Sequence, residues 1–293
     1  MPGNPILTSW LAESQRAAIG CIHAKHPRVS LSLLVLGTTI LLGWGTQPVW
    51  GIQDNSLLPT NINEEALVQI LRHVKRGMSA YDQFAIAMLL SREACEKSTT
   101  AEQEGATIED KLLKIWEEDR LDKEPYVYTD HFLVATVKRD EHKGWHAEAV
   151  LVGTMETDKK KRKSWVYNFL KVFLDNRKQT YPPDNSCFIF FSLISPCLDY
   201  CLNPESDTYI LTDLQDSLQG YDPRFQAFAF EHVYKEDQPK GQIKLWEAWR
   251  QIPMPLFRCS FDQPESCIKC TGDIDTNECL DDIGFLPPDS FFS

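Results

Sequence analysis

The sequence contains little glycine and proline, and it has no excess of basic residues. Only 14 glycines and 17 prolines occur among its 293 residues, and 43% of the residues are hydrophobic, which favours a globular chain without a long disordered tract. An internal repeat, a glycine-rich phosphate loop and a nucleophile elbow are also absent from the sequence, which excludes solenoids, P-loop nucleotide hydrolases and elbow-type serine hydrolases. The net charge of −12 argues against a general polynucleotide binder.

One long apolar run lies near the N-terminus and follows three basic residues. Residues 29–45 carry no charge, and a run of about 17 residues in that position is typical of a secretory signal peptide. The small residues Val49 and Gly51 precede a possible cleavage site at Ile52. We therefore interpret residues 1–51 as a signal peptide and expect a secreted protein. The alternative is a signal anchor that stays in the membrane.

Two cysteines follow the abrupt end of an apolar strand at residues 188–194. Ser195 is a favourable N-cap and Pro196 suits the first position of a helix. The sequence therefore predicts a helix in which Cys197 and Cys201, at i and i+4, share one face of the first turn. The positive end of the helix dipole favours thiolates, the form in which cysteine binds zinc.

His146 and Glu148 stand two positions apart, where a second helix is expected to begin. Inside a helix their side chains would point to different faces, so they can share a pocket only at its start. His146, Cys197 and Cys201 would give zinc three protein ligands and leave the fourth position for water. Zinc lowers the pKa of such a water, and Glu148 would move its proton.

His146-Ala147-Glu148 followed by Ser195-Pro196-Cys197 and Cys201 resembles the signature of zinc deaminases. Over about residues 62–260 the chain resembles the AID/APOBEC-like branch of the cytidine deaminase fold. With its signal peptide it is most similar to the secreted AID/APOBEC-like deaminases of bony fishes. The expected elements follow the family's order along the chain. They are strands at 83–90 and 131–140, a helix that begins at residue 146, a strand at 188–194, a strand-like run at 224–237, a helix at 242–252 and a strand at 255–260.

The resemblance implies a three-layer α/β fold with a mixed sheet of about five strands flanked by helices. Residues 52–260 would form the zinc domain, and residues 261–293 a cysteine-rich tail. The family also implies substrate contacts from Ala147, Ser195 and Tyr234. For Tyr234 the alternative is local packing at a hairpin end.

Two departures from the family pattern concern the site. The two cysteines are spaced one residue further apart than in the commonest form. Ile194 stands where AID/APOBEC enzymes often have a tryptophan that walls the base pocket.

The expected reaction is the hydrolytic removal of the exocyclic amine of cytosine, with Zn²⁺ as cofactor and Glu148 as proton carrier. The substrate would be a nucleoside or a single-stranded polynucleotide, and the choice of cytosine rests on the resemblance alone. Two alternatives remain. One is a secreted, disulfide-stapled binding protein with a catalytically silent zinc site, and the other is an intracellular polynucleotide editor.

Eight of the nine cysteines follow residue 51, and an even set outside the cell indicates disulfides unless a metal binds some of them. The four between residues 259 and 279 could instead hold a second, structural zinc ion. Many pairings are possible, and the sequence does not choose among them. The disulfide candidates are Cys95, Cys187, Cys259, Cys267, Cys270 and Cys279.

Two polar stretches carry no assigned chemistry. Residues 94–110 read as a polar loop, followed by a short amphipathic helix at 111–120. The basic run at 158–164 could bind phosphates, but we interpret it as a solvated segment.

Removing residues 1–51 would change the net charge of the protein from −12 to −14, because they carry three basic residues and one acidic residue.

Overall fold

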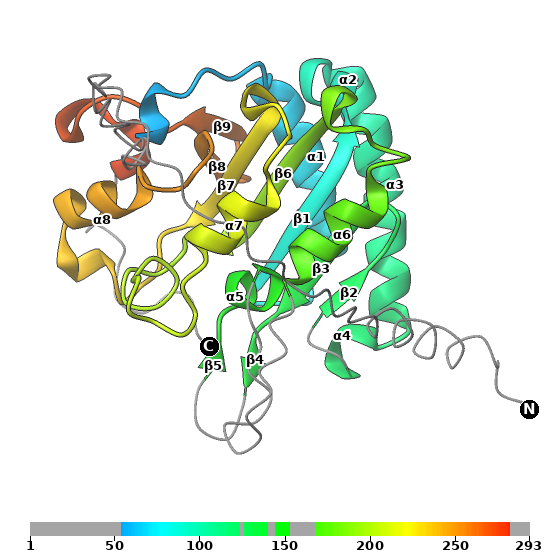
Figure 1. Cartoon of the computed structure of the whole chain (residues 1–293), viewed down its shortest axis with the longest axis horizontal. Coiled ribbons are helices and arrows are strands. Elements are labelled where there is room, and N and C mark those ends of the chain that lie inside the picture. Colours follow the sequence, from blue (N-terminus) through cyan, green and yellow to red (C-terminus); the bar gives the residue numbers. More distant parts are fainter. Residues whose placement is uncertain (1–53, 124–125, 140–143, 153–167, 282–293) are drawn as a thin grey trace, which may run out of the picture. The chain divides into compact units, whose positions relative to one another are not determined.

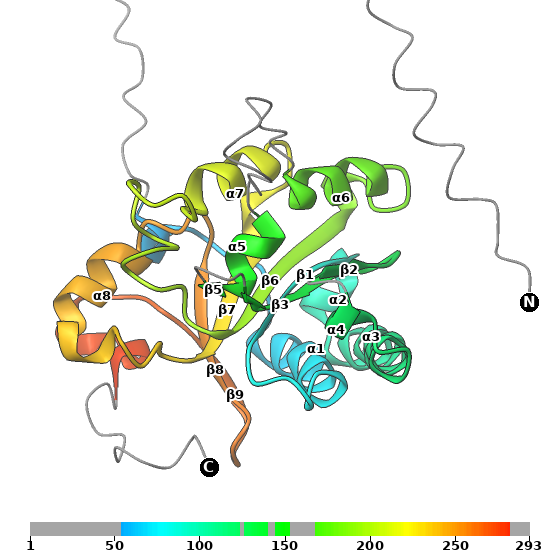
Figure 2. The same cartoon turned by 90° about the horizontal axis from the view of Figure 1, so that it is seen from below.

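The central strands of the structure are apolar along nearly their whole length, because helices cover both faces of the sheet (Figures 1 and 2). The computed structural model describes residues 54–123, 126–139, 144–152 and 168–281. The predicted signal peptide and the basic run at 158–164 lie outside these residues.

The strands and helices alternate along the chain, as expected for an α/β fold. The strands are β1 (Phe84–Ser91), β2 (Tyr126–Tyr128), β3 (Phe132–Thr136), β4 (Lys138–Arg139), β5 (Gly144–Trp145), β6 (Ser186–Ile194), β7 (Gln226–His232), β8 (Leu256–Ser260) and β9 (Ser266–Lys269). The α-helices are α1 (Glu64–Gly77), α2 (Arg92–Glu96), α3 (Ser98–Glu117), α4 (Arg120–Lys123), α5 (Ala147–Val152), α6 (Phe169–Arg177), α7 (Leu211–Ser217) and α8 (Gln242–Trp249). Short 3-10 helices cover Asn55–Leu57, Pro183–Asn185, Pro223–Phe225, Gln238–Lys240, Ile274–Thr276 and Glu278–Leu280.

Seven strands form one mixed sheet in the order β2-β3-β1-β6-β7-β8-β9. β1 pairs antiparallel with both β3 and β6, whereas β7 is parallel to β6 and β8. The five strands expected from the sequence are present, and the predicted pairing of 83–90 with 131–140 is confirmed. The two additional strands, β2 and β9, lie at the two edges. Because β9 pairs with β8, the boundary expected at residue 260 falls within the sheet.

Alternate residues of β1 point to opposite sides of the sheet and enter two separate cores. Ala85, Ala87 and Leu89 pack with residues of α5, α6, α7 and α8. Ile86 and Met88 pack on the other face with α1 and α3. Figure 2 shows the sheet between these two helical layers. The predicted three-layer α/β class is confirmed.

Helix α3 corrects the expectation of a polar loop at 94–110 and a short helix at 111–120. A single helix spans Ser98–Glu117, and its buried residues recur at the spacing of three and four that an amphipathic helix requires. Position 105 requires glycine because α1 passes close by. A Cβ atom there would lie 2.7 Å from Cδ2 of His73. The buried positions are Ala101, Gly105, Ile108, Leu112 and Ile115.

Among the described residues, the six cysteines outside the predicted metal site form three disulfides, so the prediction of disulfides is confirmed. Cys95 at the end of α2 is bonded to Cys187 on β6, across 92 residues of sequence. The other two bonds lie in the C-terminal part, Cys259–Cys267 between paired strands and Cys270–Cys279 after them. A second zinc site in this part is not what the structure shows, because all four of its sulfurs are in disulfides.

The Cys95–Cys187 bond is expected to contribute more to stability than the Cys259–Cys267 bond. In the loop-entropy description, closing 92 residues stabilises by about 4.5 kcal/mol and closing 8 residues by about 2.5 kcal/mol. We therefore compare two double-alanine variants, one without each bond. The variant without Cys95–Cys187 should lose about 2 kcal/mol more of its free energy of unfolding than the variant without Cys259–Cys267, measured by denaturant unfolding. Equal losses would show that native packing outweighs loop entropy here.

Within the described residues, no helix is both long and apolar enough to cross a membrane.

Candidate metal centre

His146 lies immediately before α5, whose first residue is Ala147. All six residues of α5 are buried, and the helix packs against β1 and β3. His146 and Glu148 therefore both point into one site from the start of a helix, as the sequence predicts. The small side chain of Ala147 lets the helix begin directly against the sheet.

The two cysteines lie in a turn and not in the predicted helix. We call Cys197–Leu202 the cysteine turn; the Leu202 N–H donates to the Cys197 carbonyl at 3.0 Å, and the Cys201 N–H donates to the Cys197 Sγ at 3.4 Å. Pro204 keeps the turn from continuing as a helix, since proline lacks the N–H donor and disfavours helical backbone in the residue before it. One turn is nevertheless enough to bring both thiols to the same side.

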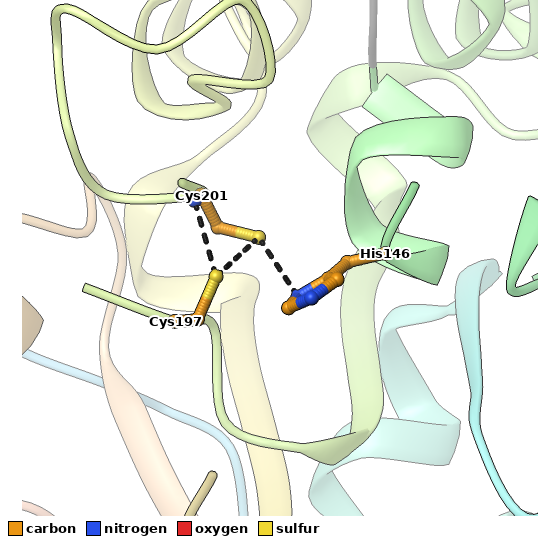
Figure 3. A group of neighbouring side chains, drawn as sticks. All are labelled: His146, Cys197 and Cys201. Carbon is orange, nitrogen blue, oxygen red and sulfur yellow. Dashed lines mark hydrogen bonds between the residues drawn. The ribbon is translucent and has the colours of Figure 1, made fainter. Parts of the chain in front are cut away.

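His146, Cys197 and Cys201 form one cluster (Figure 3). Their potential ligand atoms all lie within 4.8 Å of one another. The two Sγ atoms are 3.5 Å apart, and Cys201 Sγ is 3.7 Å from Nδ1 of His146. Both cysteines are buried and the histidine is partly buried. The structure thus brings together the three side chains predicted as metal ligands.

The cluster separates the pKa values of its members. Hydrogen bonding to Cys201, helped by His146 and opposed by burial, lowers the pKa of Cys197 to about 4. Hydrogen bonding to Cys197 and burial raise the pKa of Cys201. Burial lowers the pKa of His146, but the Cys197 thiolate and Glu148 outweigh it, so that this pKa is raised. A metal would displace the remaining protons from these ligands.

Glu148 is fully buried beside the cluster. Its Oε1 accepts a hydrogen bond from the Ser192 hydroxyl at 2.7 Å, whereas Oε2 has no partner among the described residues. Burial is the main cause that raises the pKa of Glu148. Sequence reasoning missed Ser192, although a hydroxyl in the middle of the apolar strand β6 was a usable signal.

The residues present fit a zinc ion. Two thiolates and one imidazole are a ligand set that zinc binds, and three protein ligands leave one position for water. Oε2 of Glu148 is buried without a partner among the described residues, and it would accept a hydrogen bond from such a water. These side chains would therefore hold the metal and its water without leaving a buried carboxylate oxygen unsatisfied.

Ser195 does not cap a helix, which corrects the prediction made for it. Its N–H donates to the His232 carbonyl at 2.7 Å, and its hydroxyl accepts from the Tyr234 N–H at 3.0 Å. The Leu198 N–H is instead bound by the Asp237 carboxylate at 2.8 Å. Sequence reasoning missed Asp237, because nothing local shows that a residue 39 positions away reaches the cysteine turn.

Two tyrosines lie next to His146. The ring of Tyr234, after β7, is 5.3 Å from the imidazole, and that of Tyr200, in the cysteine turn, is 6.1 Å away. Tyr200 is 54% exposed and was not singled out in the sequence. Ile194 leaves no aromatic ring at the family's tryptophan position, so these tyrosines are the aromatic neighbours of the site. Substrate contact by Ala147, Ser195 and Tyr234 stays a prediction.

The family model described as Secreted Novel AID/APOBEC-like Deaminase 1 matches residues 64–283, which include α1, the whole metal centre and β9. No match to the chain was found among curated proteins or among solved structures.

Proposed function

Since the chain belongs to the family Secreted Novel AID/APOBEC-like Deaminase 1, we propose that it is a zinc-dependent hydrolytic deaminase that acts on cytosine. The observation that carries this proposal is the buried Glu148, which stands two residues after the predicted ligand His146 and has one free carboxylate oxygen. A purely structural metal site gains nothing from such a group. Cytosine as the base rests on the family resemblance.

In the proposed mechanism His146, Cys197 and Cys201 hold zinc, which when bound makes water nucleophilic at neutral pH. Glu148 accepts a proton from the attacking water at Oε2 while the Ser192 hydroxyl holds Oε1 in place. Glu148 then returns the proton to the departing amine. The water oxygen is added at C4 of cytosine, the C–N bond breaks, and uracil and ammonia leave. Burial raises the pKa of Glu148 toward neutral pH, which suits a group that takes up a proton and then returns it.

The direct test is an assay of the chain with its disulfides formed and zinc bound. Cytidine, deoxycytidine and single-stranded oligonucleotides would be supplied separately, and uracil products measured by mass spectrometry. Adenine-containing substrates are the control for the choice of base. We expect turnover of cytosine in at least one substrate class and none of adenine.

The two tyrosines beside His146 are proposed to stack on the base. Stacking contributes about 1–3 kcal/mol per base, so Tyr200→Ala or Tyr234→Ala should lower kcat/KM by about fivefold to a hundredfold, mainly through KM. The corresponding phenylalanine variants should keep most activity because they retain the ring. Tyr128→Ala, at an exposed position on edge strand β2, is the matched control. An unchanged KM in both alanine variants would show that the base does not stack there.

We also propose that the protein is exported and that residues 1–51 are removed. The family's description as secreted and the three disulfides support export. Mass spectrometry of protein collected from the medium of expressing cells should find an N-terminus near Ile52 and the three disulfide-linked peptides. Cytosolic protein that retains residues 1–51 would instead support the intracellular editor.

A further inference from the structure

We infer that Asp237 is a positioning residue that holds the cysteine turn in the geometry needed for metal binding. The inference rests on the proposed function only in that the cysteine turn carries two of the metal ligands. Asp237 itself does not belong to the ligand cluster. It lies in the segment after β7, and its side chain is fully buried.

Both carboxylate oxygens of Asp237 are engaged. Oδ2 accepts the N–H of Leu198 at 2.8 Å, and Oδ1 accepts from Nζ of Lys240 at 2.7 Å. A carboxylate that accepts from a backbone N–H and an ammonium makes charge-assisted hydrogen bonds, which are stronger than neutral ones. The residue fixed in this way, Leu198, directly follows the ligand Cys197.

Further contacts join the same two segments. Lys240 also bridges to the Asp199 carboxylate at 2.7 Å. On the other side of the ligand, the Ser195 hydroxyl accepts the N–H of Tyr234 at 3.0 Å. The chain on both sides of Cys197 is therefore held by the segment Tyr234–Lys240. The segment that carries the proposed base-stacking tyrosine and the turn that carries the thiols are bound together.

The cysteine turn needs such an external partner because it is not a helix. In a helix, neighbouring turns would hold both cysteines in place, whereas here one wide turn ends before Pro204. Asp237 replaces the missing helical support at the Leu198 N–H. Residues that orient metal ligands in this indirect way typically change metal affinity 10-fold to 100-fold when they are lost.

Asp222 provides a matched control at the opposite end of β7. It too accepts a backbone N–H, that of Arg224 at 3.0 Å, and it pairs with the Arg224 guanidinium at 2.8 Å. Strand β7 has 7 residues and separates the two aspartates, which corresponds to roughly 20 Å. A substitution at Asp222 therefore removes a similar set of interactions far from the thiols.

The experiment compares Asp237→Asn and Asp237→Ala with the same substitutions at Asp222, in the full chain with its disulfides formed. Asparagine keeps an oxygen for the Leu198 N–H, whereas alanine removes it. Zinc affinity is measured by competition with a chromogenic chelator, and ligand geometry by the absorption bands of the cobalt(II)-loaded protein. The melting temperature of the metal-free protein reports stability separately.

We expect zinc to bind about 10-fold more weakly to Asp237→Asn and about 100-fold more weakly to Asp237→Ala. The cobalt bands should shift in both variants, and the Asp222 variants should match the wild type. Should Asp237→Ala fail to fold, Asp237→Asn decides the question. Wild-type zinc affinity and cobalt bands in Asp237→Asn would overturn the inference, but the proposed metal site and function would still stand. A wild-type chain that binds no zinc would overturn both the inference and the proposed function.

Discussion

Glu148→Gln is expected to slow cytosine deamination by about a hundredfold to ten-thousandfold, which is the usual contribution of general acid and base catalysis. Glutamine has nearly the same shape and can still accept the Ser192 hydrogen bond, but it cannot accept a proton. Zinc content and melting temperature should therefore stay close to those of the wild type. Product formation from cytidine, deoxycytidine and single-stranded oligonucleotides is the measurement.

Ser192→Ala is the matched variant for this prediction. It leaves the Glu148 carboxylate in place and removes only the hydroxyl that binds Oε1. Its activity should lie between those of the wild type and Glu148→Gln. A wild-type chain that binds zinc but is silent on every substrate at several pH values would favour the disulfide-stapled binding protein instead.

His146→Ala or Cys197→Ser should reduce bound zinc well below one ion per chain. The loss of one ligand leaves one or both cysteine thiolates buried without a metal, which is costly. With free zinc at a thousandfold excess over its Kd, binding stabilises the wild type by about 4 kcal/mol, and both variants should lose this stabilisation. Metal analysis and melting curves with and without added zinc are the measurements.

The control for the ligand variants removes the Cys270–Cys279 disulfide with two alanines. Zinc should remain at one ion per chain in this control, even though stability falls. Unchanged zinc content in both His146→Ala and Cys197→Ser would place the ligands elsewhere. A loss of zinc in the control would revive the tail cysteines as metal ligands.

Local patterns correctly predicted that His146, Cys197 and Cys201 come together in one cluster. His146 and Glu148 lie at a helix start, and a two-residue spacing can serve one site only there. The central strands were recognisable because burial on both faces requires uninterrupted apolar runs. Helix α3 was missed although its spacing was visible, because small residues such as Ala101 and Gly105 occupy part of its buried face. Small residues occupy that face because α1 packs closely against it, and the local sequence does not show this contact.

The sequence by itself thus determined the α/β class and the three side chains that form the candidate metal cluster, and it singled out Glu148 as the proposed proton carrier, since these depend on short-range spacing. Tertiary structure alone decided how the six disulfide candidates pair, because sulfurs up to 92 residues apart meet only when the strands and helices pack. It also decided that the cysteines occupy a turn held by Asp237, and that Ser192 binds Glu148. Hydrogen bonds between segments 39 and 44 residues apart depend on the folded chain and leave no periodic trace in the sequence.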